Sequence, residues 1–166
     1  MVDKIKAFPW PVYKIKLGTG DDLRVIQCLR KITNAVFRVD ANCAWTPTQT
    51  IEYTKSFKSL GVEFIEQPLA AGDWEGMVEV YKYTTLPIIA DESCVEMIDV
   101  MRCKGHFHGV NIKLMKCGGL LMARKMITQA KSLGLKVMVG CMTESSVGIS
   151  AVSQLLPMLD YVDTVS

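Results

Sequence analysis

Several features that would assign a chain to a special class are missing from these 166 residues. No block of like charges occurs and the net charge is only +2, which disfavours nucleic acid or an anionic membrane as a partner. The apolar runs are strand-sized, far short of the roughly 20 residues of a membrane span. No apolar segment follows a basic start, so we expect no secretory signal. The six cysteines form no CxxC pair, which favours free thiols and a cytoplasmic location.

The composition is that of a folded protein. Hydrophobic residues make up 49% of the chain and charged residues 22%, a balance typical of globular domains. A chain of this length can bury one substantial core, so we expect a single domain over residues 1–166.

A repeated strand–helix pattern is the main signal in the sequence. Apolar, β-branched runs predict strands at 12–17, 35–40, 62–66, 86–91, 109–113 and 136–139, with another beginning at 161. Helical spacing predicts helices at 23–32, 46–60, 73–83, from 92 to about 104, 119–132 and 147–156. Repeated βα units favour a parallel sheet covered by helices. The pattern therefore predicts most of a (β/α) barrel, with a doubly wound open sheet as the alternative.

Charged residues stand at or just beyond the ends of the predicted strands. They recur at intervals of 22 to 31 residues: Lys16, Asp40, Glu66, Asp91, Lys113 and Glu144. In either fold, catalytic groups gather at the carboxyl ends of the strands. Three carboxylates brought together there need a divalent cation, and an all-oxygen set favours Mg²⁺ or Mn²⁺. Lysines on both sides of such a site could move a proton to or from a metal-bound substrate.

Six ordered motifs then match a known family. They are Tyr-Lys14-Ile-Lys16-Leu-Gly, Arg-Val-Asp40-Ala-Asn42-Cys-Ala-Trp, Phe-Ile-Glu66-Gln-Pro-Leu, Ile-Ala-Asp91-Glu-Ser, Asn-Ile-Lys113-Leu-Met-Lys-Cys-Gly-Gly and Gly-Cys-Met-Thr-Glu144-Ser-Ser-Val-Gly. The chain thus resembles the muconate-lactonizing branch of the enolase superfamily and, within it, the dipeptide epimerases of the alanine–glutamate type. The resemblance runs from about residue 8 to 163 and is specific as an ordered set.

The resemblance implies a role for each motif residue. Asp40, Glu66 and Asp91 would bind Mg²⁺, and Lys16 and Lys113 would be the two acid/base catalysts of dipeptide epimerisation through a metal-stabilised enediolate. Substrate-binding roles would fall to Lys14, which would hold a carboxylate or tune Lys16, and to Asp163 and Glu144. Racemases of N-acyl amino acids and cycloisomerases share these lysines and carboxylates, so both stay open.

Two departures from the family pattern shape the expectation for this chain. Family members begin with an α+β capping domain and a first barrel strand, whereas this sequence starts just before the second barrel strand. Dipeptide epimerases also end their last strand with Asp-x-Asp, but here Asp163 is followed by Val165 at the second position. We therefore expect a truncated barrel with weak or no turnover by itself. A homo-oligomer, a complementing chain or an inactive barrel fragment are the alternatives.

Plainer interpretations apply to single residues. One carboxylate at a strand end is more often a helix cap or a solvated loop residue, and only the full set favours a metal site. Cys103, His106 and His108 superficially resemble a zinc cluster, although no fourth ligand is evident. The glycine pair at 118–119 either cradles a phosphate or simply makes a turn.

Overall fold

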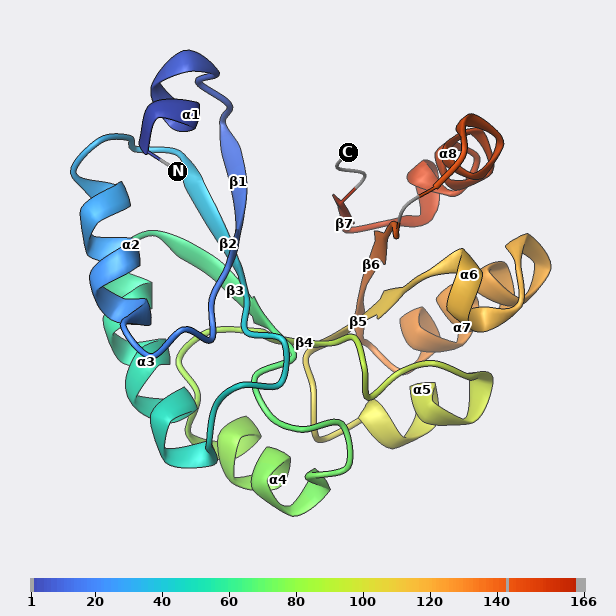
Figure 1. Cartoon of the computed structure of the whole chain (residues 1–166). Coiled ribbons are helices and arrows are strands. Elements are labelled where there is room, and N and C mark those ends of the chain that lie inside the picture. The colour runs from blue at the N-terminus through green and yellow to red at the C-terminus, as the bar shows by residue number, and fades with distance from the viewer. Residues whose placement is uncertain (1, 143, 164–166) are drawn as a thin grey trace. The chain divides into compact units, whose positions relative to one another are not determined.

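A computed structural model describes residues 2–142 and 144–163. The described residues form two compact units, which divide between Ile88 and Ile89. Strands and helices alternate along each of them (Figure 1). None of the helices in these two stretches is long and apolar enough to cross a membrane. The six cysteines are all free.

Unit 1 is built around three parallel strands in sequence order. Its elements are α1 (Val2–Ala7), β1 (Val12–Lys16), α2 (Asp22–Arg30), β2 (Val36–Asp40), α3 (Pro47–Ser59), β3 (Val62–Glu66) and α4 (Trp74–Tyr83). Helices α2 and α3 pack against each other and α3 packs on β3 (Figure 1). The core between strands and helices is fully buried and apolar, with Phe37, Phe57 and Ile65 among its largest side chains.

Unit 2 repeats the same arrangement. Its elements are β4 (Ile88–Ala90), α5 (Met97–Cys103), β5 (Gly109–Ile112), α6 (Leu114–Cys117), α7 (Leu120–Ser132), β6 (Lys136–Gly140), α8 (Ser146–Ser153), the 3₁₀ helix η1 (Leu156–Met158) and β7 (Tyr161–Asp163). Strands β4 to β7 pair in parallel in sequence order. Helix α7 packs on β5 and β6 and also contacts α5. Helices thus cover the strands from outside, as the continuous apolar strands require.

The predicted strands and long helices are confirmed to within a few residues. Helix α3 shows why: Thr46 accepts a hydrogen bond from the Gln49 amide, and the Gln49 side chain accepts one from the Thr46 amide, with Pro47 at the first helical position. Two short helices, α1 and α6, were not predicted, because neither is long enough to show an apolar period.

A buried carboxylate organises the loop that follows β1. Asp22 accepts hydrogen bonds from the backbone amides of Gly18 and Thr19, each at 3.0 Å, and from the Trp45 indole N–H at 2.7 Å. Burial alone raises the pKa of Asp22, but the donors from Thr19, Trp45 and Gly18 outweigh it and hold the pKa below its usual value. Trp45 belongs to the loop after β2, so Asp22 ties together two loops at the carboxyl ends of neighbouring strands.

Asp22 should therefore stabilise the fold in a pH-dependent way. We expect Asp22→Asn to lower the free energy of unfolding at pH 7 by about 1.5–3 kcal/mol, because an amide N–H would face the existing donors. The folded pKa lies below the unfolded value of about 3.9, so this contribution is present above that pH and is lost as pH falls through the folded pKa. Urea unfolding of both proteins between pH 7 and pH 3 measures it.

The neighbouring exposed Asp21 provides a matched control. It makes no side-chain cap to α2, so Asp21→Asn should change the free energy of unfolding by less than about 0.5 kcal/mol. Equal effects of the two substitutions would show that the Asp22 hydrogen bonds do not hold these loops.

Candidate active site

In unit 1, two buried carboxylates end adjacent strands at the same level. Asp40 closes β2 and Glu66 closes β3, and the parallel register places them side by side, with Lys16 of β1 beside Asp40. Asp40 is 2% exposed and Glu66 is fully buried. A charged carboxylate at such a site needs a compensating cation. The strands thus deliver two of the three predicted metal ligands to one edge of the unit.

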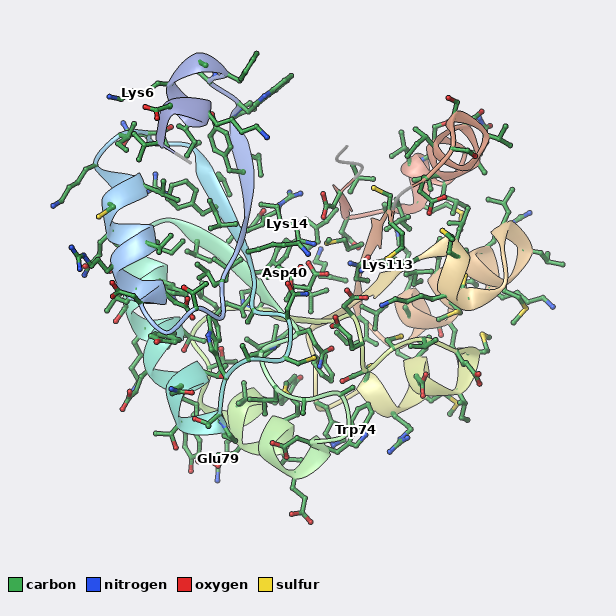
Figure 2. All side chains as sticks on the ribbon, in the orientation of Figure 1. Lys6, Lys14, Asp40, Trp74, Glu79 and Lys113 are labelled. Atoms are coloured by element: carbon green, nitrogen blue, oxygen red, sulfur yellow. The ribbon has the colours of Figure 1, made fainter. Side chains whose placement is uncertain are left out.

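Lys14 supplies that compensation in this structure. Its Nζ lies 3.1 Å from Asp40 Oδ2 and 2.8 Å from Glu66 Oε2, so a single ammonium bridges both carboxylates. Figure 2 shows Lys14 reaching from β1 toward Asp40. Because side chains repeat every second residue along a strand, Lys14 shares its face with Lys16 but lies two residues deeper, and it is largely buried.

Lys16, the first predicted acid/base residue, stands at the solvent side of this cluster. Its side chain is 72% exposed, and its Nζ lies 3.9 Å from Asp40 Oδ2 and 3.5 Å from Asn42 Oδ1. The amine is therefore close to a proposed metal ligand yet accessible to a bound molecule. This is the position that proton transfer to or from a substrate would need.

The loop after β2 has an unusual backbone. Asn42 and Cys43 have positive φ angles of 45° and 65°, which Asn tolerates better than most residues. This conformation turns the backbone N–H of Asn42 toward Asp40, and the N–H donates a 3.1 Å hydrogen bond to Asp40 Oδ1. The Cys43 amide donates to the carbonyl of Gln67, just after Glu66, at 2.8 Å. The loops that follow the two carboxylates are thus fastened to each other.

In unit 2, Asp91 follows β4 and is 1% exposed. It meets two amines: Lys113 Nζ lies 2.5 Å from Oδ2 and Lys116 Nζ lies 3.0 Å from Oδ1. Burial raises the pKa of Asp91, but the two ammonium groups outweigh it and hold the pKa below its usual value. The third predicted ligand and the second predicted acid/base lysine therefore form an ion pair, and Lys113 lies at the carboxyl end of β5 (Figure 2).

Lys116 was not predicted as a site residue. Its signal is the spacing of three residues from Lys113, which places both side chains on one face of a helical turn. The short helix α6 creates that face, and it was taken from the sequence as a plain turn. The glycine pair makes the turn as expected: Gly118, with φ 88°, ends α6, and Gly119, with φ 101°, precedes α7.

The predicted substrate-binding residues of unit 2 lie on the neighbouring strands. Asp163 is the last residue of β7, is half-buried and pairs in register with Gly140 of β6. Glu144 lies on the loop before α8, also half-buried, and its carboxylate occupies the space that a Cβ at residue 148 would need. Gly148 therefore makes room for Glu144. Val165 lies outside the described residues, so the second position of the Asp-x-Asp motif is not tested.

The chemistry of the carboxylate set fits a hard divalent cation. All three proposed ligands offer oxygen and are buried at strand ends, as Mg²⁺ sites require. Taken within either unit by itself, no three described His, Cys, Asp or Glu side chains are close enough to hold a metal ion, since unit 1 carries two of the carboxylates and unit 2 the third. Cys103, His106 and His108, all in unit 2, likewise do not form a group that could hold a metal ion.

Known proteins resemble this chain over nearly all of its length. Residues 3–163 match the family model described as enolase C-terminal domain-like. An L-Ala-D/L-amino acid epimerase of Flavobacterium johnsoniae is 60% identical over 98% of this chain and 48% of its own length. A crystal structure of a dipeptide epimerase from Enterococcus faecalis complexed with Mg and L-Leu-L-Tyr is 31% identical, with a TM-score of 0.89 over 98% of this chain and 48% of that chain.

A crystal structure of N-succinyl Arg/Lys racemase from Bacillus cereus is 30% identical, with a TM-score of 0.92 over 98% of this chain and 48% of that chain. The chain thus spans about half the length of these relatives. The likeness confirms the predicted fold class, the (β/α) barrel of the enolase type, over the doubly wound alternative. The motif set, the parallel βα units and these matches agree: the chain belongs to the enolase C-terminal domain-like family.

Proposed function

We propose that this chain is the catalytic barrel part of a Mg²⁺-dependent dipeptide epimerase. One observation carries the proposal: each predicted acid/base lysine stands at the carboxyl end of a strand, Lys16 as the last residue of β1 and Lys113 directly after β5, beside a buried carboxylate that is a predicted metal ligand. Lys16 lies 3.9 Å from Asp40, and Lys113 lies 2.5 Å from Asp91. The names of the relatives support the same activity, because they include L-Ala-D/L-amino acid epimerase and a dipeptide epimerase crystallised with Mg and a dipeptide.

The proposed metal site consists of Asp40, Glu66 and Asp91. Their oxygens are the ligand type that Mg²⁺ prefers, and their burial keeps water from weakening the interaction. When bound, Mg²⁺ supplies Lewis-acid stabilisation of negative charge on the substrate carboxylate. The ion pairs of these carboxylates with Lys14 in unit 1 and with Lys113 in unit 2 support the proposal, because each carboxylate already lies beside a positive charge.

The proton steps belong to the two lysines. A neutral lysine amine removes the α-proton of the substrate residue that carries the free carboxylate, and the C–H electron pair stays on that residue. The ammonium of the other lysine then donates a proton to the opposite face, which inverts the carbon. In the reverse direction Lys16 and Lys113 exchange the roles of base and acid, so each acts as the base toward one of the two epimers.

We assign substrate recognition to three charged groups, one in unit 1 and two in unit 2. Lys14 would hold a substrate carboxylate or tune Lys16, and Asp163 would pair with the α-ammonium of a dipeptide. Glu144 lies on a loop at the carboxyl end of β6 and would take part in the same binding. We further propose a single truncated barrel domain over residues 1–166, in a cytoplasmic protein whose chain acts as a homo-oligomer or with a complementing chain.

Racemisation of N-acyl amino acids is the second candidate function. It is favoured by the likeness to the N-succinyl Arg/Lys racemase structure, since the same carboxylates and lysines serve both reactions. The two substrates differ in one group, because an acylated amino acid has no free ammonium. Asp163 at the end of β7 therefore favours the dipeptide.

Exchange of the substrate α-proton in D₂O tests the lysines. With Mg²⁺ and L-Ala-L-Glu or L-Ala-D-Glu, the chain should exchange the α-proton of the Glu residue, even if net turnover is slow. Lys16→Ala and Lys113→Ala should each lower the rate of epimerisation by about 10²–10⁴-fold. Each variant should also slow α-proton exchange from one epimer much more than exchange from the other. Proton NMR follows both.

Two exposed helix lysines serve as controls for that experiment. Lys58→Ala in α3 and Lys125→Ala in α7 should leave exchange unchanged. Exchange that survives in both site variants would refute the two-lysine mechanism. No exchange by the wild-type chain with any dipeptide would support the inactive fragment.

Metal binding can be measured without substrate. Mg²⁺ at about 100 times its Kd should stabilise the chain by roughly 2.7 kcal/mol, seen as a higher Tm that EDTA reverses. Asp40→Asn, Glu66→Gln and Asp91→Asn should each remove most of this shift. Glu79→Gln on the exposed face of α4 should keep it (Figure 2). A Mg²⁺ shift that is intact in all three variants would show that the ion binds elsewhere.

The two candidate functions separate at Asp163. We expect Asp163→Asn to lower kcat/KM for dipeptides by about 10–100-fold, the loss of one charge-assisted hydrogen bond, and to leave N-succinyl amino acids nearly unaffected. Parallel assays with both substrate classes measure the ratio. An equal loss for both classes would remove the ammonium role from Asp163.

A further inference from the structure

Asp91 is the only one of the three proposed ligands in unit 2, and it carries a different amine on each oxygen. Lys113 contacts Oδ2 at 2.5 Å, and Lys116 contacts Oδ1 at 3.0 Å. The proposed reaction uses Lys113 and gives no part to Lys116. Yet an ion pair to a carboxylate that is 1% exposed differs from an ordinary surface pair, which contributes little.

The backbone fixes the distance between the two lysines. The amides of Lys116 and Cys117 both donate to the Lys113 carbonyl at 3.0 Å, which closes the turn of α6. Gly118 then ends the turn in the left-handed conformation and donates its amide to the Leu114 carbonyl. Lys116 is thus held on the same face as Lys113, close to Asp91 but further toward solvent, with 25% of its side chain exposed.

The two amines face different demands under the proposed function, on which this inference rests. Lys113 must leave Asp91 to reach a substrate carbon, whereas nothing in that reaction requires Lys116 to move. A buried carboxylate is costly to keep charged without nearby cations. An amine that stays on Oδ1 keeps Asp91 oriented, while Oδ2 becomes accessible.

We propose that Lys116 is a positioning residue for the metal site. It holds Asp91 by Oδ1 and leaves Oδ2 as the oxygen that would bind Mg²⁺, so that it acts on metal affinity through Asp91 and not on the proton transfer. Hydrogen-bonded partners of metal-binding carboxylates generally have this effect, and their loss typically lowers metal affinity 10–100-fold. The opposite possibility is that Lys116 competes with the cation, in which case its removal would tighten binding.

Mg²⁺ titration of the full chain, without substrate, separates these cases. Lys116→Met keeps the apolar stem and removes the charge, and it should weaken Mg²⁺ binding by about 10–100-fold. Lys116→Arg keeps the charge and should restore most of that loss. Lys125→Met, the same change at an exposed site on α7, should bind as wild type does. Calorimetry and the Mg²⁺-dependent Tm shift give two independent measurements.

Each outcome decides the inference. Weaker binding by Lys116→Met, with recovery in Lys116→Arg, supports it. Unchanged or tighter binding overturns it and leaves the proposed metal site intact. If Lys116→Met does not fold, Lys116→Gln and Lys116→Arg carry the test, and Mg²⁺ affinities equal to wild type in both overturn it. A wild-type chain that does not bind Mg²⁺ at all overturns the proposed metal site together with this inference.

A second measurement separates positioning from catalysis. Because Lys116 is proposed to act only through Asp91, saturating Mg²⁺ should restore α-proton exchange in Lys116→Met to within about threefold of wild type, less than 1 kcal/mol. Lys113→Met should remain inactive at any Mg²⁺ concentration. Exchange by Lys116→Met that stays lost at saturating Mg²⁺ would refute the positioning role and make Lys116 a catalytic residue.

Discussion

The cost of burying carboxylates at strand ends governs both halves of this chain. Asp40, Glu66 and Asp91 are almost fully buried, and an ionised carboxylate in such a place must be paired or it would take up a proton. Each unit solves this with its own lysines: Lys14 serves the two carboxylates of unit 1, and Lys113 with Lys116 serves the one in unit 2.

Parallel strand geometry explains why lysines two or three residues apart have different surroundings. Lys14 and Lys16 share one face of β1, but Lys14 is deep enough to bridge two carboxylates, whereas Lys16 extends into solvent. In unit 2 the strand ends before Lys113, and a helical turn brings Lys116 back to the same face. Depth along a strand thus distinguishes a buried bridging cation, Lys14, from a solvent-accessible one, Lys16, whereas in unit 2 the turn brings both amines to one carboxylate.

The sequence predicted the repeated βα units well because apolar runs and capping residues are local signals. The strand ends at Asp40 and Glu66 were predicted correctly, because a charged residue directly after an apolar run can be recognised from a few neighbouring residues. Contacts between loops were not predictable in the same way. Nothing in the sequence near Asp22 indicates that Trp45 donates to it, and nothing near Asp91 indicates Lys116, because these partners are set by tertiary packing. The helix predicted from residue 23 therefore begins within one residue of α2, but the joining of two loops by Asp22 was not predicted.

The lysines that neutralise the proposed metal ligands are not equivalent. Lys14 contacts one oxygen on each of Asp40 and Glu66, so a cation bound there would compete with its ammonium. Under the proposed function, a substrate carboxylate would replace a contact that Lys14 gives up. Lys116 needs no such replacement, because it contacts Asp91 through Oδ1 while Lys113 contacts Oδ2. Under the proposed function, Lys14 would thus link metal binding to carboxylate binding in unit 1, whereas in unit 2 Asp91 would keep Lys116 and exchange only Lys113.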